Sequence, residues 1–111
     1  MSGRATAAAN ELVIGGRLVD APQRRCTPAG VPITRFVIEH DSEQMEAGHP
    51  RRVQCRLRVV AVGDPLAGRC AALQAGSLVR VSGFLARAGY RAPDMKTELH
   101  ARTVESVTEA N

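Results

Sequence analysis

Arginine recurs at alternate positions near the middle of the chain, in a pattern suited to holding phosphate groups. Arg52, Arg56 and Arg58 occupy even positions, whereas the odd positions from 53 to 59 hold Val, Cys, Leu and Val. A period of two places the arginines on one face of a β-strand and the apolar residues on the other. The guanidinium fork donates two parallel hydrogen bonds to a phosphate, and a polyanion would relieve the repulsion between arginines that share a strand face. A solvated outer face explains the same pattern, so both interpretations stand at this point.

Two further groups of basic residues lie outside this stripe. Arg24 and Arg25 follow the first apolar segment, where the chain is expected to turn. Every one of the 15 basic residues except Lys96 is an arginine, and the formal net charge of +4 attracts polyanions. A GC-rich coding bias would also produce this excess of arginine. The third group surrounds a loop expected after the fourth strand and consists of Arg87, Tyr90, Arg91 and Lys96.

The sequence holds no residue pattern typical of a catalytic or metal site. The three histidines, His40, His49 and His100, are far apart, and the three cysteines form no C-x-x-C pair. Neither a glycine-rich phosphate loop nor a nucleophile elbow is present. The acidic residues between positions 39 and 46 are interpreted as a solvated loop. We therefore expect a protein that is not an enzyme and uses no metal or cofactor.

Cysteine usage and hydropathy indicate a cytoplasmic protein. An odd number of dispersed cysteines is typical of reduced thiols. No apolar run is long enough to span a bilayer, and no charged-then-apolar leader is visible, so we expect no membrane contact. Residues 1–10 are interpreted as a flexible N-terminal tail, residues 11–108 as a single domain and residues 109–111 as the C-terminal end.

Alternating apolar residues predict five β-strands and one short helix. The polar stretch at 41–50 is interpreted as a loop between the second and third strands, and the T-P-A-G segment at 27–30 as a turn. The spacing of Leu66, Cys70 and Leu73 predicts a short helix after the third strand. The predicted strands cover residues 12–18, 31–40, 51–60, 77–87 and 95–107.

This element order is that of the OB-fold, an all-β five-stranded barrel with a short helical segment between strands 3 and 4. A small open β-sandwich is the alternative, which the single helix after the third strand disfavours. In OB-folds, the face of strands 2 and 3 and the loops after strands 1 and 4 bind oligonucleotides. The three basic groups fall on these elements, which favours single-stranded nucleic acid as the ligand.

Aromatic residues are scarce, so the expected binding depends mainly on arginine. The chain has two phenylalanines, one tyrosine and no tryptophan. Stacking on an aromatic ring contributes roughly 1–3 kcal/mol per base. Phe36 and Phe84 are assigned to the core or the barrel rim, which leaves Tyr90 as the candidate for base stacking. Binding through arginine and phosphate should weaken steeply with salt.

Five segments resemble the primosomal replication protein N (PriB) family, a branch of the bacterial single-stranded DNA-binding proteins. The resemblance spans residues 10–108. It implies an OB-fold homodimer that binds single-stranded DNA and assists the primosomal helicase PriA at stalled replication forks, with transfer to the loader DnaT in some bacteria. The segments are 27–32 (TPAGVP), 36–40 (FVIEH), 46–48 (EAG), 81–84 (VSGF) and 99–101 (LHA).

The resemblance also implies particular contacts with DNA. Gln54 stands where better-known members have a tryptophan on the exposed face of strand 3, and His49 stands where they have a phenylalanine in the preceding loop. Both exchanges remove stacking surface. The positions that match the family in kind are Arg25, Arg51, Arg91 and Lys96. The complete predicted binding set is Arg24, Arg25, His49, Arg51, Arg52, Gln54, Arg56, Arg87, Tyr90, Arg91 and Lys96.

We therefore hypothesise a single-stranded DNA-binding accessory protein of the replication-restart primosome. One alternative is a general single-stranded nucleic-acid coating protein. Such proteins usually end in a long tail with acidic and apolar residues, whereas this sequence ends at Asn111, soon after the last predicted strand. Another alternative is a protein-interaction module that docks onto the helicase and binds DNA only incidentally.

Overall fold

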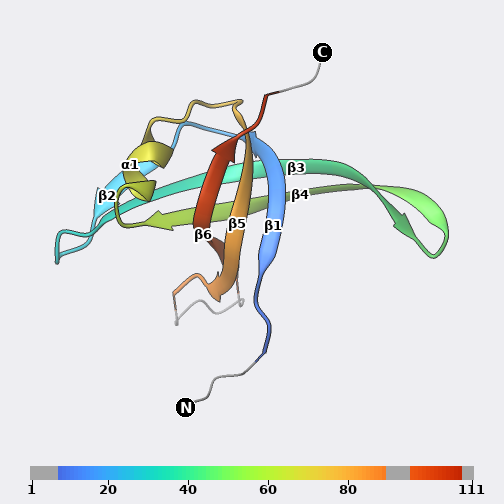
Figure 1. The fold of residues 1–111 in the computed structure, drawn as a ribbon, viewed down its shortest axis with the longest axis horizontal. Helices are drawn as coiled ribbons and strands as arrows, with labels where there is room; N and C mark the ends of the chain where they lie inside the picture. Colours follow the sequence, from blue (N-terminus) through green and yellow to red (C-terminus); the bar gives the residue numbers. More distant parts are fainter. Residues whose placement is uncertain (1–7, 90–95, 109–111) are drawn as a thin grey trace.

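The structure, a computed structural model, describes residues 8–89 and 96–108, which form six β-strands and one short helix (Figure 1). Five of the strands correspond to the predicted ones, and the helix follows the third of these, as predicted. The short strand β2 was not predicted. The elements are β1 (Leu12–Leu18), β2 (Gln23–Cys26), β3 (Pro32–Glu46), β4 (His49–Val62), α1 (Leu66–Ala71), β5 (Leu78–Arg87) and β6 (Thr97–Ser106).

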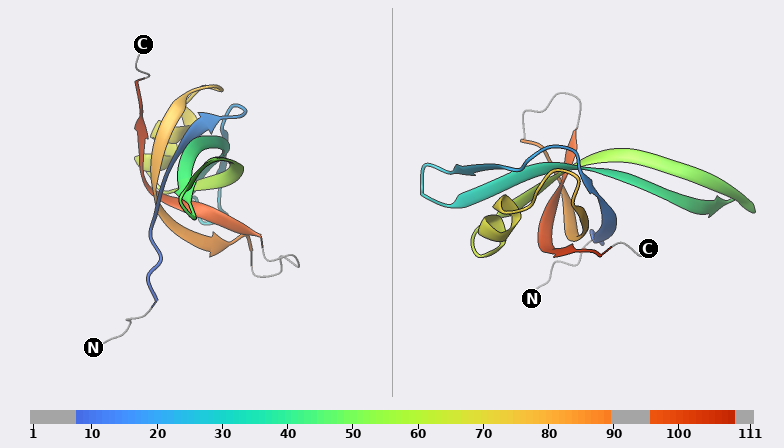
Figure 2. Two further views of the ribbon diagram at one scale, coloured as in Figure 1. Left: turned by 90° about the vertical axis from the view of Figure 1, so that its right-hand side faces the viewer. Right: turned by 90° about the horizontal axis from the view of Figure 1, so that it is seen from above.

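The strands form one sheet that closes on itself. Its order is β1-β5-β6-β4-β3-β2, and an additional antiparallel pairing between β1 and β3 closes a barrel of five strands. β4 and β6 pair in parallel, whereas the other neighbours are antiparallel. β1, β5 and β6 cross the long β3–β4 pair steeply (Figures 1 and 2). The OB-type barrel is confirmed, and the open sandwich is not observed.

The core fills this barrel from alternate strand positions. α1 packs against β3, β4 and β6, where the buried Thr34 hydroxyl donates a hydrogen bond of 2.6 Å to the Ala67 carbonyl. Burial raises the pKa of the Cys70 thiol on the same helix, so this thiol stays protonated near neutral pH. Phe36 is buried, as expected, and Phe84 is half-buried. The side chains with no exposed surface include Ile38, Val59, Val79, Val81 and Leu99.

The segment at 41–50 is part of a β-hairpin, so its prediction as a loop was wrong. β3 and β4 continue through it, and a two-residue turn at Ala47 and Gly48 joins them with φ angles of 52° and 81°, as tight hairpin turns require. The resulting arm, defined as residues 39–56, extends well beyond the barrel (Figure 2). Most of its side chains are exposed on both faces. The segment therefore lacks the apolar alternation by which a strand is recognised in sequence.

Arg24 and Arg25 lie on the edge strand β2, whereas the sequence predicted a turn there. They pair with Thr34 and Ile33 of β3. β2 has only four residues and no buried one, so no hydrophobic period could reveal it. The predicted turn comes next, where the Gly30 amide donates to the Thr27 carbonyl at 2.8 Å. Gly30 has a φ of 86°, which glycine adopts at little cost.

Hydrogen bonds fix the C-terminal end of β5. Asn10, the last residue of the predicted tail, donates to the Leu85 carbonyl and accepts from the Leu85 amide, each at 2.8 Å. Residues 1–7 of that tail lie outside the described residues. Just past the same end of the strand, the Ala88 amide donates to the Lys96 carbonyl at 2.9 Å. No helix in the described ranges has the length and apolar character needed to cross a membrane.

Candidate nucleic-acid interface

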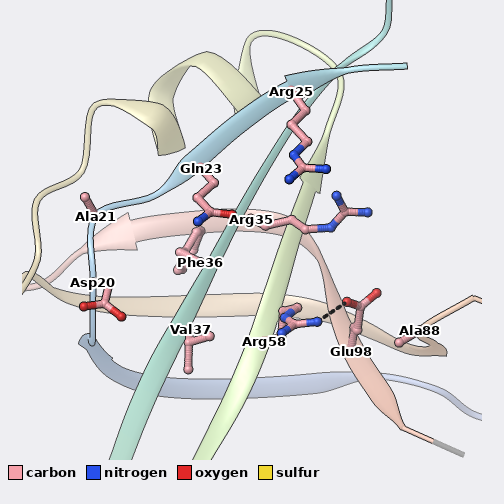
Figure 3. A pocket seen from close by; sticks show the side chains of 10 residues that line it. All are labelled: Asp20, Ala21, Gln23, Arg25, Arg35, Phe36, Val37, Arg58, Ala88 and Glu98. Atoms are coloured by element: carbon pink, nitrogen blue, oxygen red, sulfur yellow. Dashed lines mark ion pairs between the residues drawn. The ribbon is translucent and has the colours of Figure 1, made fainter. Parts of the chain in front are cut away.

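A cleft of about 440 Å³ lies on the outward face of β2, β3 and β4 (Figure 3). Arg25 of β2, Arg35 of β3 and Arg58 of β4 all line it, and it reaches the chain between β1 and β2 and the chain after β5. These elements are the ones on which the sequence placed an oligonucleotide. We call this hollow the barrel cleft. Its lining residues are Asp20, Ala21, Gln23, Arg25, Arg35, Phe36, Val37, Arg58, Ala88 and Glu98.

The antiparallel pairing of β2 and β3 brings Arg25 and Arg35 together. Arg35 lies opposite Gln23, and Arg25 lies opposite Ile33, so the two arginines are diagonal neighbours on one face. Their guanidinium groups lie toward each other in Figure 3. Neither forms an ion pair with any residue in the described part of the chain. Two adjacent guanidinium groups that form no ion pair are suited to bind a phosphate between them.

A second cleft of about 250 Å³ adjoins the barrel cleft along β4 and β6. Arg58 and Glu98 line both clefts, and their side chains form an ion pair with an N···O distance of 3.7 Å. Arg56 and Lys96 add two cations to the second cleft. The two clefts together make a continuous basic surface on the outer side of the barrel, which we call the groove.

The arginines of the arm are paired with carboxylates. Arg51 lies 2.7 Å from Glu46, and Arg56 lies 3.6 Å from Glu39, its cross-strand partner. All of these side chains are more than 45% exposed. The mutual repulsion that the sequence suggested for the arginine stripe is therefore compensated inside the chain.

Arg52 and Asp41 form the closest of these pairs. Arg52 donates from Nε to Oδ1 at 3.2 Å and from an Nη atom to Oδ2 at 2.7 Å. The hydrogen bonds from Arg52 are the main cause that lowers the pKa of the Asp41 carboxyl, and they raise the pKa of Arg52 in return. Gln54 also donates to Asp41, at 3.4 Å, so its amide is turned toward the carboxylate.

The predicted binding residues thus fall into separate groups. Arg25 lies in the barrel cleft, and Lys96 and Arg56 lie in the second cleft. Arg24 forms an ion pair of 3.7 Å with Asp64. The remaining described members lie on the arm or at the end of β5, namely His49, Arg51, Arg52, Gln54 and Arg87. Tyr90 and Arg91 lie outside the described residues.

Arg35, Arg58 and Glu98 are among the groove residues that were absent from the predicted set. Arg58 belongs to the arginine stripe, and Arg35 shares the outward parity of β3, so strand alternation alone could have placed both on the groove face. No sequence signal identifies Glu98, because its burial depends on the parallel contact of β6 with β4. Among residues 8–89 and 96–108, no group of acidic, histidine or cysteine side chains is placed to hold a metal ion.

Comparisons with known proteins agree with this architecture. A family model described as another single-strand binding protein family matches residues 10–103. The structure resembles the single-stranded DNA-binding protein of Thermus aquaticus, with a TM-score of 0.73 at 24% identity over 90% of this chain and 50% of that one. At that identity the likeness concerns the fold alone. Fold and family match together define the class, a protein of the single-strand binding type.

More similar relatives narrow this class. The replication restart protein PriB of Proteus mirabilis is 40% identical over 89% of this chain and 94% of its own length. That of Photorhabdus laumondii is 39% identical over 88% and 93%. PriB of Ralstonia solanacearum gives a TM-score of 0.76 at 27% identity, over 89% of this chain and 98% of that one. The chain belongs to the replication restart protein PriB family, whose members are named for replication restart and not for a catalysed reaction.

Proposed function

We propose that the protein binds single-stranded DNA in the groove and acts in replication restart. The observation that supports this most directly is the convergence of Arg25, Arg35 and Arg58 from three strands on one cleft. The chain's membership of the PriB family points to the same role. The cleft lies on the face by which OB-folds bind oligonucleotides.

The DNA backbone would follow the line of cations along the groove. A phosphate between Arg25 and Arg35 meets two guanidinium groups that have no carboxylate to give up. The next phosphates reach Arg58 and then Lys96 in the second cleft. Each neutralised phosphate releases counterions, so the affinity falls with salt.

The predicted residues outside the groove form the flanks of the same path. Arg87 extends it at the end of β5, whereas Arg24, paired with Asp64 on the other face of β2, is assigned a smaller contribution. Tyr90 and Arg91 are proposed to contact the strand from the loop after β5, Tyr90 by stacking. On the arm, a phosphate would have to displace a carboxylate from Arg51, Arg52 or Arg56. We therefore propose that the arm, which includes His49 and Gln54, contributes less to the DNA affinity than the groove does.

Fluorescence anisotropy of a labelled oligo-dT, titrated over a series of salt concentrations, tests this proposal. We expect tight binding at low salt, a log–log slope near 0.7 per phosphate contact and weaker binding to a duplex of equal length. Arg25→Ala with Arg35→Ala should lower the slope by about 1.4. Arg69→Ala with Arg80→Ala removes the same charge away from the groove and should leave the slope unchanged. Absence of binding at low salt, or binding indifferent to salt, would overturn the proposal.

We further propose, on the basis of family membership, a cytoplasmic homodimer that assists PriA and exchanges with DnaT. A specific observation supports a docking role for the arm. Its cations are already paired with carboxylates, and Met45 near its tip is 68% exposed. A PriA pull-down with Arg25→Glu and Arg35→Glu separates the two functions. If DNA binding is lost and the helicase is retained, docking does not depend on the groove.

A further inference from the structure

Glu98 is an anion in the middle of a groove lined by cations. Its side chain is only 10% exposed, and it lines both the barrel cleft and the second cleft. Its one partner in the described part of the chain is Arg58, at 3.7 Å, which is too long for a hydrogen bond. Figure 3 shows the two side chains facing each other across the cleft.

No oxygen of Glu98 is both fully buried and without a hydrogen-bond partner, so the carboxylate opens onto the cleft and can accept hydrogen bonds from a ligand there. An ionised carboxylate accepts at both oxygens and donates nothing. A phosphate cannot occupy this position, because the two anions repel each other. The group that fits beside Glu98 is therefore one that donates hydrogen bonds, and in a DNA strand such groups are on the base edges.

The four bases differ in what they offer to a carboxylate. Guanine presents an imino N–H and an amino group side by side, which match the two oxygens. Cytosine and adenine each present one amino group, and an acidic side chain is a known partner of the cytosine amino group. Thymine presents a single imino N–H between two carbonyl oxygens, which a carboxylate repels.

We propose that Glu98 makes the groove selective for bases with amino donors, guanine above all, over thymine. This inference rests on the proposed binding of single-stranded DNA in the groove. Arg58 positions the carboxylate, and the flanking cations hold the phosphates on either side of the base.

The scarcity of aromatic rings supports this selectivity independently. Stacking tolerates every base, because each base has a π-face. Among the described residues that line the two clefts, Phe36 is the only aromatic one, and it is 4% exposed. Among the described residues, bases that enter this groove therefore meet hydrogen-bonding groups rather than exposed aromatic rings, and hydrogen bonds do discriminate between bases.

The test compares three labelled oligonucleotides of equal length by anisotropy. One is oligo-dT, the second has isolated guanines within the dT strand, and the third has hypoxanthine at those positions. Hypoxanthine keeps the imino N–H of guanine and lacks its amino group. We expect the guanine strand to bind at least about fivefold more tightly than oligo-dT, with hypoxanthine in between. Glu98→Gln should reduce these differences to about twofold or less, since an amide lacks the second acceptor.

Glu105→Gln is the matched control. Glu105 is an exposed residue of the same strand, lies opposite Arg80 of β5 and does not line the groove. The Glu105→Gln substitution changes the net charge by the same amount as Glu98→Gln, and the variant protein should keep the guanine preference. A preference that survives in Glu98→Gln overturns the inference.

Two further outcomes separate this inference from the function on which it rests. Normal binding of oligo-dT without any guanine preference overturns the inference and leaves the proposed function intact. Failure to bind any of the three strands overturns the proposed function itself. A thermal melt establishes whether Glu98→Gln folds. If the variant does not fold, the wild-type comparison decides. Equal affinity for the guanine and hypoxanthine strands would exclude a bidentate contact between Glu98 and guanine.

Discussion

The arm and the groove share the strands β3 and β4, yet their arginines have different electrostatic surroundings. On the arm, Arg56 lies opposite Glu39 and forms an ion pair with it. Two residues further along β4, Arg58 lies opposite Val37 and pairs instead with Glu98 of β6 at 3.7 Å, whereas Arg25 forms no ion pair with a described residue. Arg35 on β3 lies opposite Val60. The carboxylates within reach of each guanidinium group, rather than the arginine itself, thus decide whether a cation is available to an anionic ligand.

The ion pairs of the arm are weak, but they make phosphate binding less favourable on the arm than at Arg25 and Arg35. Exposed ion pairs contribute roughly 0–1 kcal/mol each, so a phosphate can compete with Glu46 or Asp41 for the arm arginines. The displaced carboxylate nevertheless stays close and repels the incoming phosphate. At Arg25 and Arg35 no carboxylate has to move, so the same phosphate contact contributes more to the free energy of binding.

The largest expected contrast between the two regions concerns stability. Val59 and Val53 have the same parity on β4, but Val59 is fully buried in the barrel and Val53 is half-buried on the arm. Val59→Ala removes buried methyl groups and leaves a cavity, so the free energy of unfolding should fall by about 2–3 kcal/mol. Val53→Ala should lower it by less than about 1 kcal/mol. Urea denaturation of both variants measures this, and equal losses would show that the arm is part of the cooperative core.

The second contrast concerns affinity for DNA. Arg25→Ala with Arg35→Ala should weaken oligo-dT binding by roughly 10- to 100-fold at low salt, because two charge-assisted contacts are lost. Arg51→Ala with Arg52→Ala removes the same charge from the part of the arm that lies outside the groove. It should weaken binding by no more than about fivefold, since the paired carboxylates are released as well. Anisotropy under one buffer condition compares the variants, and an equal loss in both would place the DNA on the arm.

Sequence patterns predicted the barrel well because most of its strands have one buried face. The alternation at 53–59 and the apolar residues of β5 gave the strands, and the helix between β4 and β5 was placed correctly. The arm was missed because a strand exposed on both faces has no apolar period. β2 was missed because it is short and has no buried residue.

The site was predicted less completely than the fold. Arg25 and Lys96 do line the groove, because both lie on elements that OB-folds commonly use. The availability of each arginine, in contrast, depends on the carboxylates that the fold brings within reach, which are Glu98 of β6 for Arg58 and, through the β3–β4 register, Glu39 for Arg56. That register runs through a hairpin which the sequence did not reveal, so neither the neutralised arm nor the role of Glu98 could be anticipated.

A smaller effect is expected when the arm is made to resemble the groove. Asp41→Asn removes the carboxylate that holds Arg52 through two hydrogen bonds, and the asparagine keeps the size of the side chain. Arg52 then becomes available to phosphate, so oligo-dT binding should tighten by about two- to fivefold at low salt. Glu105→Gln gives the same charge change away from the groove. If both variants tighten binding equally, net charge rather than the release of Arg52 is the cause.

The smallest effect is the titration of the arm pair itself. Arg52 lowers the pKa of Asp41 below its ordinary value of 3.8. The folded state therefore binds the Asp41 proton less readily than the unfolded state, so the contribution of the pair to stability is present above pH 3.8 and is lost as the pH falls through the folded pKa. Arg52→Ala should return the Asp41 pKa toward its ordinary value, whereas Arg51→Ala, which breaks the neighbouring pair with Glu46, should leave it lowered. Carboxyl-carbon NMR titration follows this residue directly. An ordinary pKa for Asp41 in the wild-type protein would mean that Arg52 is free in solution, and the arm would then be as open to phosphate as the groove.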